Sequence, residues 1–358
     1  MSLNQTNPFT VPQASRRRFL QHSLLAGTAA TLAPAAWAQT SNAANSGLRV
    51  AIIGDGRTGI WATLRSLPPQ DVQRAVAAPI SFQPGFTASL PVMEAIKAGG
   101  VDFSFATATA IVNAVAARVP IVPLAAYALP ADEVDFLVRS DSSIQSAADL
   151  KGKRIAHQNG TTGTYSLIKY LETAGLRLSD VQAVSLSGID AYTALGQGSI
   201  DGWIHWQHAS AVAKARLGNK VRLLPNVKTY DWAFYVASEK ALEKNPQAVF
   251  NLVKLIRDTQ IKINASPEAT AQLWAKQGGY REKSLEQQVF LELIRDKRLS
   301  DSTADQLRPI SEQAALATQE LADSFHKLGV LPQRTDVKSF LLNEKFAATA
   351  QRVHTTLA

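Results

Sequence analysis

Apolar positions along the chain alternate between short continuous runs and longer stretches with helical spacing. The run Leu48–Ile53 is almost wholly apolar and ends at a glycine, which predicts a buried strand. Leu90, Met93 and Ile96 recur at intervals of three and predict a helix that ends at Gly99-Gly100. The same pattern predicts strands over 48–53, 75–82, 101–106, 121–127, 134–139, 154–157, 181–186, 200–206, 221–224 and 233–237. It predicts helices over 60–67, 87–98, 108–117, 165–174, 190–196, 246–264, 267–276, 285–294 and 303–328.

Strands and helices alternate twice along the chain before a tail that is helical throughout. This alternation is typical of parallel sheets with helices on both faces. The sequence therefore predicts an α/β protein with two lobes and a helical C-terminal tail.

The first 38 residues have the three-part pattern of an export signal. A basic segment, Arg16 to Arg18, precedes a weakly apolar stretch over 24–36, and Ala36-Trp-Ala38 is a small-x-small cleavage site. Residues 15–21, Ser-Arg-Arg-Arg-Phe-Leu-Gln, resemble the twin-arginine consensus. We therefore expect cleavage after Ala38 and a soluble mature protein in the periplasm.

Composition excludes several classes of protein. The 358 residues contain no cysteine, so disulfide frameworks, Cys-based zinc sites and cysteine nucleophiles are ruled out. Three of the 37 basic residues lie in the export signal, so the formal charge of +8 becomes +5 in the mature chain. The remaining basic residues are scattered, without the aromatic-interleaved stripe typical of nucleic-acid binding.

Gly54-x-Gly56-x-x-Gly59 follows a predicted strand and matches the dinucleotide-binding fingerprint. The helix that follows is cut short at Pro68-Pro69, and the second strand supplies no acidic residue for a ribose. A glycine-rich turn at the mouth of a cleft is therefore the favoured interpretation of this motif.

A second turn, Asn159-Gly-Thr-Thr-Gly-Thr164, leads from a strand into a helix. Gly160, Thr161 and Thr162 combine exposed backbone with hydroxyls at a helix start, which suits an anion. Simple helix capping is the alternative. Thr107 and Thr109 provide a similar hydroxyl pair after the third strand of the first lobe.

Trp203, Trp206 and Trp232 fall within thirty positions and are candidates for an apolar pocket wall, with core packing as the alternative. His205 and His208 could ligate a metal on a helix, but the segment is predicted to be a strand, so no metal is expected. No nucleophile–base–acid constellation or HExxH motif is present. We therefore expect neither catalysis nor a cofactor.

Several motifs together resemble the periplasmic substrate-binding proteins of ABC importers, in the branch for aliphatic sulfonates, taurine and nitrate. The resemblance runs from about Leu48 to Gln277. The motifs that carry it are Phe82-Gln-Pro-Gly85, the segment 95–107 (similar to "ALxAGxIDFGxTG"), the segment 148–156 (similar to "DLKGKKVA"), Gly198-Ser-Ile-Asp-Gly-Trp203 with Trp206, and Phe234-Tyr-Val-Ala-Ser238.

The resemblance implies a type II periplasmic-binding-protein fold, in which two hinge strands join two α/β lobes. Val134–Arg139 and Ala233–Ala237 match those crossings. The implied organisation is lobe I over 48–136 and 237–330, lobe II over 137–236 and a C-terminal extension over 331–358.

The resemblance also implies a ligand between the lobes and a partner permease in the inner membrane. The site residues would be Gly56, Arg57, Thr58, Thr107, Thr109, Gly160, Thr161, Thr162, Trp203, Trp206 and Trp232. The expected function is capture of a small organic anion, most simply an aliphatic sulfonate, for uptake in sulfur metabolism. An exported nucleotide-dependent oxidoreductase that uses the Gly54–Gly59 turn is the alternative. A pyrimidine-precursor enzyme of the same fold is a third, which the missing cysteine disfavours.

Overall fold

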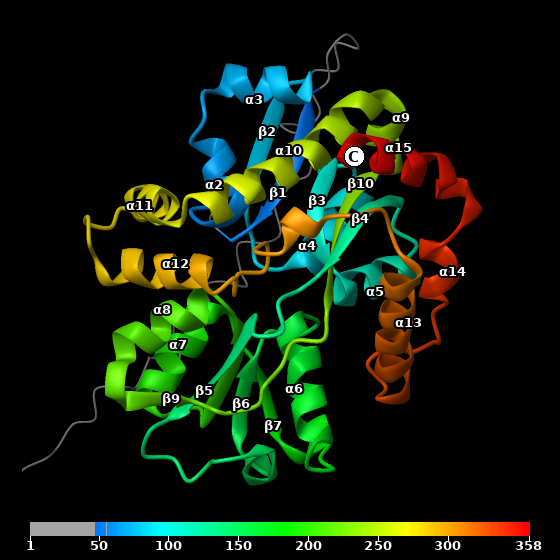
Figure 1. Ribbon diagram of the computed structural model, residues 1–358. Coiled ribbons are helices and arrows are strands. Elements are labelled where there is room, and N and C mark those ends of the chain that lie inside the picture. The colour runs from blue at the N-terminus through cyan, green and yellow to red at the C-terminus, as the bar shows by residue number, and fades with distance from the viewer. Residues whose placement is uncertain (1–46, 55) are drawn as a thin grey trace, which may run out of the picture. The chain divides into compact units, whose positions relative to one another are not determined.

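The apolar runs form two five-stranded sheets within the described part of the chain, residues 47–54 and 56–358. The structure is a computed structural model (Figure 1). The predicted export signal and its cleavage site lie outside the described residues. The strands are β1 (Leu48–Ile53), β2 (Ile80–Phe86), β3 (Phe103–Thr107), β4 (Ile121–Ala128), β5 (Val134–Arg139), β6 (Arg154–His157), β7 (Gln182–Ser185), β8 (Gly202–Trp206), β9 (Val221–Leu223) and β10 (Trp232–Ser238).

Each sheet contains one antiparallel strand. The first sheet has the order β2-β1-β3-β10-β4, and β10 runs antiparallel to both of its neighbours. The second has the order β7-β6-β8-β5-β9, and β5 runs antiparallel to both of its neighbours. The alternation of strands and helices predicted parallel sheets, and the structure has mixed sheets in which one strand of each is antiparallel. The chain enters β5 and β10 directly from a strand of the other sheet. An antiparallel strand can be reached in this way, because only a parallel connection within one sheet requires a helical crossover.

The chain crosses between the sheets twice, through residues 129–133 and 224–231 (Figure 1). The first crossing leads from β4 into β5, and the second leads from β9 into β10. The two predicted hinge strands, Val134–Arg139 and Ala233–Ala237, lie in β5 and β10. Each of them belongs to one sheet and begins directly after a crossing. The predicted lobe boundaries, after 136 and after 236, fall inside β5 and β10.

Helices cover the two sheets. They are α2 (Gly59–Arg65), α3 (Pro69–Val76), α4 (Ser89–Lys97), α5 (Ala108–Ala116), α6 (Thr162–Glu172), α7 (Gly188–Gln197), α8 (Ala209–Leu217), α9 (Glu239–Lys244), α10 (Pro246–Ala265), α11 (Pro267–Gln277), α12 (Leu285–Arg295), α13 (Glu312–Lys327), α14 (Val337–Leu341) and α15 (Ala347–Leu357). None of the helices in the described ranges combines the length and apolarity that a bilayer crossing requires.

Two predicted elements differ from the structure. The strand predicted over 75–82 begins only at Ile80, because α3 occupies the preceding residues with Val72 and Val76 on its buried face. The left-handed φ of 64° at Ala77 ends that helix. The helix predicted from 303 begins at Glu312, after Ser311 accepts a capping hydrogen bond from Ala314 N.

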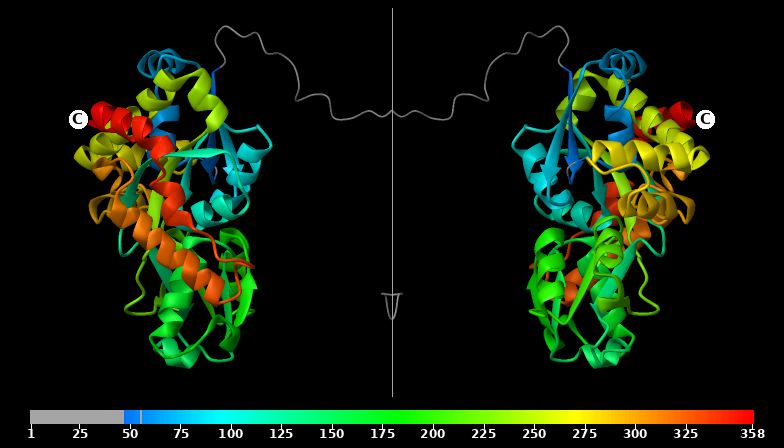
Figure 2. Two further views of the ribbon diagram at one scale, coloured as in Figure 1. Left: turned by 90° about the vertical axis from the view of Figure 1, so that its right-hand side faces the viewer. Right: turned by 90° about the vertical axis from the view of Figure 1, so that its left-hand side faces the viewer.

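Side chains alternate across the first sheet and bury both of its faces. Val50 and Ile52 join one apolar cluster with residues of α2, α3, α10 and α11. Ala51 joins a second cluster with residues of α4, α5 and α13. The second sheet has two clusters of its own. Figure 2 shows helices on both sides of the first sheet, so the predicted two-lobed α/β architecture is confirmed.

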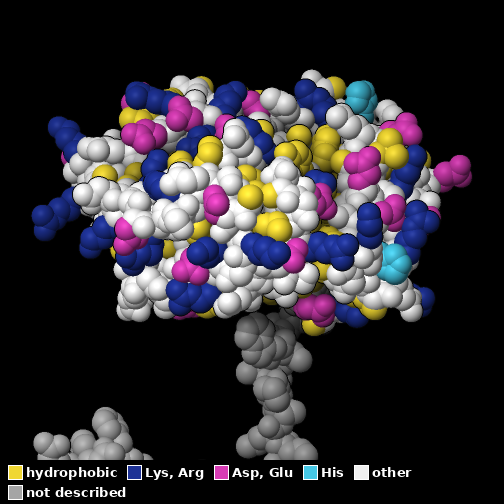
Figure 3. Space-filling model, turned by 90° about the horizontal axis from the view of Figure 1, so that it is seen from below, with side chains coloured by type: hydrophobic (Ala, Val, Ile, Leu, Met, Phe, Trp, Pro, Cys, Tyr) yellow, Lys and Arg dark blue, Asp and Glu magenta, His cyan; other side chains and the backbone are white. Residues whose placement is uncertain are grey.

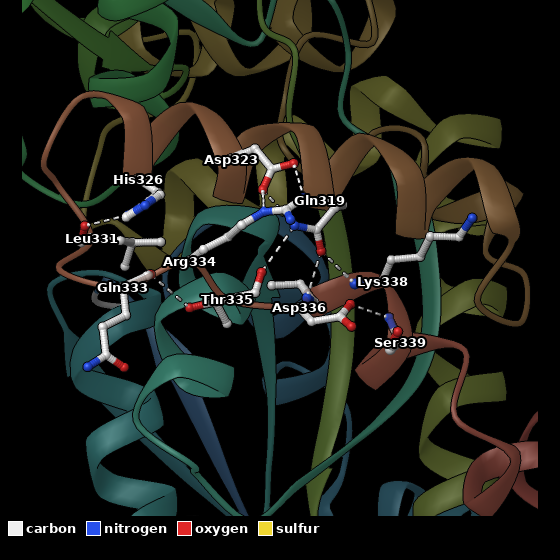
Figure 4. Close-up of polar contacts among 11 residues, drawn as sticks. Gln319, Asp323, His326, Leu331, Gln333, Arg334, Thr335, Asp336, Lys338 and Ser339 are labelled. Atoms are coloured by element: carbon white, nitrogen blue, oxygen red, sulfur yellow. Dashed lines mark hydrogen bonds and ion pairs between the residues drawn. The ribbon is translucent and has the colours of Figure 1, made fainter.

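The C-terminal segment is held against α13 by Gln319 (Figure 4). Its side-chain Oε1 accepts hydrogen bonds from Val337 N (2.7 Å) and Lys338 N (3.0 Å), and its Nε2 donates to Thr335 O (3.1 Å). Val337 is fully buried in the cluster on that face of the first sheet. Residues 331–341 are therefore packed against the first sheet's helices.

Candidate functional site

Residues from both sheets line a cavity of about 720 Å³. They include the ends of β1, β3 and β8 and the turn that follows β6. The carboxyl ends of parallel strands are the usual ligand position in open α/β sheets. The volume lies in the range of small-molecule sites.

Helix N-termini surround this cavity. The first residues or caps of α2, α4, α5, α6, α7 and α8 lie among the described residues that line it. The amides of a first helical turn have no intrahelical acceptor and carry a partial positive charge. None of the described lining residues is a lysine or an arginine. The partial positive charge at these helix starts therefore comes from backbone amides and not from lysine or arginine side chains.

The carboxyl group of Asp231 lies against the partial positive charge at the starts of two of these helices. Its carboxylate accepts hydrogen bonds from Ala108 N (3.0 Å) at the start of α5 and from Thr162 Oγ1 (2.8 Å) at the start of α6. Thr109 Oγ1 (2.7 Å) and Trp232 N (2.8 Å) donate to the same carboxylate. Burial raises the pKa of Asp231, and these donors oppose that rise. The hydroxyls of Thr109 and Thr162 are thus bonded to a protein carboxylate.

The carboxyl group of Asp301 lies in the same way against the start of α2. Its Oδ2 accepts a hydrogen bond from Ile60 N at 2.7 Å, and burial raises the pKa of its carboxyl group. Gly59 has a φ of 74°, and a Cβ there would lie 2.7 Å from the same Oδ2. The fingerprint glycine therefore makes room for a carboxylate. Asp301 already accepts the hydrogen bond from an amide of the helix start that the fingerprint would offer to a pyrophosphate.

Seven of the residues proposed from the sequence line the cavity: Gly56, Thr58, Thr107, Gly160, Thr161, Thr162 and Trp206. The other four, Arg57, Thr109, Trp203 and Trp232, are not among its lining residues. Arg57 is exposed to solvent, whereas Thr109 is fully buried beside Asp231. Trp203 is 1% exposed and packs in the core of the second sheet.

An aromatic wall of the cavity escaped the sequence analysis. It is formed by Trp61, Phe105 and Tyr235, which come from α2, β3 and β10. The ring of Tyr235 lies edge-on to those of Trp61 (6.3 Å between centroids) and Phe105 (6.0 Å). Phe105 precedes Thr107 by two positions and so lies on the same face of β3, a signal that was present in the sequence.

Glu133 is the last residue of the first crossing and lines the cavity. It is 2% exposed, and its Oε1 accepts a hydrogen bond from Ser300 Oγ at 2.6 Å. Burial raises the pKa of its carboxyl group to about 8. Gln207, which is also 2% exposed, donates its backbone N–H to Glu133 O at 2.7 Å. No local pattern in the sequence marks Glu133 as a site residue, whereas Gln207 lies between β8 and α8, the same kind of strand-to-helix position as Thr161.

The histidines at the end of β8 do not form a metal centre with Asp201. His205 Nδ1 lies 3.0 Å from Trp206 O, and burial lowers the pKa of His205 to about 4, so its ring is neutral. Asp201 pairs with Arg154 at 2.9 Å. Across the described ranges no group of three or more His, Asp or Glu side chains could hold a metal ion.

Comparison with solved structures defines the class of the fold. The chain superimposes on the alkanesulfonate-binding protein SsuA from Xanthomonas axonopodis pv. citri, solved bound to MOPS, with a TM-score of 0.68 and 23% identity. The match covers 82% of this chain and 97% of that one. The fold is therefore that of the periplasmic binding proteins, as the sequence predicted.

Comparison with known sequences defines the family. The sequence model described as "NMT1/THI5 like" matches residues 83–270, more than half of the chain, so the protein belongs to this family. An Escherichia coli (strain K12) protein named "Putative aliphatic sulfonates-binding protein" is 25% identical over 253 residues, or 71% of this chain and 76% of that protein. A Brucella abortus (strain 2308) binding protein is 26% identical over 265 residues, or 72% of this chain and 78% of that protein. The resemblance described from the sequence is confirmed.

Proposed function

We propose that this protein is the solute-binding component of an ABC importer and captures an aliphatic sulfonate in the cavity between its sheets. One observation carries the proposal: the cavity is rimmed by helix N-termini, and none of its described lining residues is a lysine or an arginine. Backbone amides bind a sulfonate by hydrogen bonds and partial charge. The names of the sulfonate-binding relatives support the same ligand class.

The sulfonate head fits best at the starts of α4, α6 and α7. Asp231 accepts a hydrogen bond from the first amide of α5, and Asp301 accepts one from Ile60 N in the first turn of α2. At α6 Asp231 accepts a hydrogen bond from the hydroxyl of Thr162 and not from a backbone amide. The N-terminal residues of α4, α6 and α7 also line the cavity, and each helix has at least nine residues. Their first-turn amides therefore supply the donors for the oxygens of the sulfonate.

The apolar tail of the ligand fits against the aromatic side of the cavity. Trp61, Phe105 and Trp206 supply flat apolar surface there. Ile189 also lines the cavity and is 76% exposed, an unusual exposure for a large apolar side chain. A ligand tail that covers Ile189 would remove this surface from water.

Closure of the lobes would couple binding to transport. Gln158 Nε2 in the second lobe donates to Thr87 O in the first over 2.9 Å, and Arg216 of α8 pairs with Glu286 of α12 at 2.8 Å. A ligand that contacts both lobes favours the closed state over the open one. The closed state would be the form recognised by an inner-membrane permease.

The protein would act in the periplasm after cleavage of its signal, without catalysing a reaction. On the face shown in Figure 3, basic and acidic side chains are interspersed. Such a surface lacks the continuous basic stripe that a nucleic acid requires. The partners we propose are therefore a small anion and a permease.

Titration calorimetry tests the proposal with alkanesulfonates of two to eight carbons and with the alcohols of the same lengths. We expect saturable binding of the sulfonates and none of the alcohols, because only the sulfonates carry the charge that the helix starts stabilise. Equal binding of both series, or binding of neither, would refute the proposal.

A further inference from the structure

Glu133 and Gln207 lie side by side on the wall of the cavity. The β5–β8 ladder pairs Val134 with Trp206, and the hydrogen bond from Gln207 N to Glu133 O extends that pairing by one residue. Residues directly opposite in an antiparallel ladder direct their side chains to the same face. Both side chains line the cavity, and both residues are 2% exposed. An acidic side chain therefore forms part of the wall of a cavity whose helix starts suit an anion.

An ionised Glu133 would leave two buried oxygens of this pair without a donor. Glu133 Oε2 and Gln207 Oε1 have no hydrogen-bond partner among the described residues. Gln207 Nε2 donates to the carbonyl oxygen of Asp132 at 3.3 Å, which assigns Oε1 as the acceptor of that amide. A carboxylate only accepts hydrogen bonds, whereas a protonated carboxyl group also donates one. A proton on Glu133 Oε2, donated to Gln207 Oε1, would satisfy both atoms at once.

The charges around Glu133 also favour its neutral form. Burial raises the pKa of Glu133, the hydroxyl of Ser300 opposes that rise, and the like charges of Asp231 and Asp135 add to it. Arg298 pairs with Asp135 at 2.9 Å, and none of the described residues that line the cavity is a lysine or an arginine. An ionised Glu133 would thus be a buried charge without a cation beside it in the described wall, which is costly.

We propose that Glu133 works as a neutral carboxylic acid that donates its proton to Gln207 Oε1, and that capture of an anion in this cavity depends on that proton. The inference rests on the proposed function, because it sets the condition under which the same cavity takes a sulfonate. Release of the proton to solvent would place a full negative charge on the wall of an anion site. The anion and the proton therefore bind cooperatively, each raising the affinity of the site for the other.

The pH range of this coupling follows from Glu133. The pKa of Glu133 is raised to about 8, and that of His205 is lowered to about 4. A sulfonate keeps its single negative charge from pH 6 to pH 9.5, so a change of affinity over this range comes from the protein. The charged groups that face Glu133 or share its cavity are Asp135, Asp231, Asp301 and Arg298, and the other titratable groups there are Tyr127, Tyr235, His205 and His208.

Calorimetry with propane-1-sulfonate from pH 6 to pH 9.5 tests the coupling. We expect an affinity that is constant up to pH 7 and falls about tenfold per pH unit above pH 8. At pH 9 close to one proton should be taken up per sulfonate bound. Titration in Tris and in borate measures that uptake, because these buffers differ in ionisation enthalpy and neither contains a sulfonate group.

Glu133→Gln identifies the group, because its amide carries no charge and offers an N–H donor at every pH. We expect this variant to bind propane-1-sulfonate with an affinity independent of pH and without proton uptake at pH 9. It should therefore bind more tightly than the wild type at pH 9.5. Glu94→Gln, at an exposed position on α4, is the matched control and should keep the wild-type pH profile.

Each outcome has a defined meaning. A wild-type affinity that is constant to pH 9.5, or a decline that survives Glu133→Gln, would overturn the proton requirement and leave sulfonate capture intact. If propane-1-sulfonate binds at no pH, the proposed function fails and the coupling fails with it. Infrared difference spectra need no ligand: raising the pH from 6 to 9.5 should remove a protonated-carboxyl band from the wild type that Glu133→Gln lacks. Identical difference spectra for the two proteins would show that Glu133 is not the neutral acid.

Discussion

Thr162 Oγ1 donates a hydrogen bond of 2.8 Å to the carboxylate of Asp231, and this bond connects the start of α6 to the residue that precedes β10. The same carboxylate accepts a hydrogen bond from the first amide of α5. One buried anion of the protein thus serves helices that cover different sheets. The bond lies beside the second crossing of the chain, where movement between the lobes would be concentrated.

Replacing Asp231 should destabilise the protein and create a new anion site. Asp231→Ala leaves the hydroxyls of Thr109 and Thr162 and two backbone amides without their acceptor, which should cost about 3 kcal/mol of unfolding free energy. Urea denaturation measures the loss. Added sulfate should restore more stability to this variant than to the wild type, because the helix starts would be open to an external anion.

Asp231→Asn is the control for that experiment, since it retains one acceptor oxygen and should lose less stability than the alanine variant. If sulfate stabilises the alanine variant and the wild type equally, Asp231 does not occupy the anion-binding position that its contacts indicate.

Glu133→Gln should make the protein more stable in mild alkali. The pKa of Glu133 is raised from 4.5 to about 8 by burial, so the folded state holds a proton that the unfolded state releases. The stability that this proton contributes is full below pH 4.5 and is lost as the pH rises to 8. The variant keeps an uncharged group at every pH. Its unfolding free energy should match that of the wild type near pH 4.5 and exceed it by about 2–4 kcal/mol above pH 8.

Thermal unfolding of both proteins from pH 4.5 to 9 provides the measurement. Asp231 and Asp301 also have raised pKa values, so the difference between the two proteins, rather than either curve alone, reports on Glu133. A difference that is constant across this range would contradict the assignment.

Ile189→Ser should weaken binding of long alkanesulfonates and leave short ones unaffected. Ile189 offers an exposed apolar surface at the cavity, and covering most of it should contribute about 1–2 kcal/mol, or roughly 5–30-fold in the dissociation constant. Calorimetry with ethane- and octanesulfonate separates the two cases. Ile261→Ser, at a 48% exposed position on α10 that does not line this cavity, is the control.

Gln319→Ala should release the segment that leads to α14. The variant loses the acceptor for Val337 N and Lys338 N and the donor to Thr335 O, at a cost of about 1–3 kcal/mol. Limited proteolysis should then cleave within residues 328–341 faster than in the wild type. The exposed Gln351→Ala variant should be cleaved like the wild type, and equal cleavage of all three proteins would show that Gln319 is dispensable there.

The local pattern of apolar and polar residues was sufficient to predict most of the strands. The predicted bounds of β1, β5 and β6 match the structure because each is a short apolar run between turns or polar residues. Thr107 and Thr161 were found because each follows a strand and precedes a helix, the position where open α/β sheets bind ligands.

The spacing of the tryptophans held information that composition alone did not. Trp203 and Trp206 are three positions apart on β8, and residues an odd number apart in a strand face opposite sides of the sheet. Trp203 packs in one core cluster of the second sheet and Trp206 against the other. Trp206 also lines the cavity because it is the last residue of β8, at the end of the strand that reaches the cavity.

The acidic residues of the site could not have been found from the sequence. Asp301 bonds to Ile60 across 241 positions, and Glu133 lies in a crossing with no periodic pattern. Their places depend on how distant segments meet in three dimensions. Only the folded structure brings Ser300 against Glu133.

The position of β10 sets the order in which the chain can fold. This strand lies between β3 and β4, yet it is synthesised more than a hundred residues after β4 begins. The first sheet therefore remains split until the whole second sheet has emerged, and the first 130 residues cannot complete a domain while still attached to the ribosome. The second sheet consists of strands within residues 134–223 and can form before β10 is made, whereas the first sheet and the ligand cavity between the lobes can be completed only afterwards.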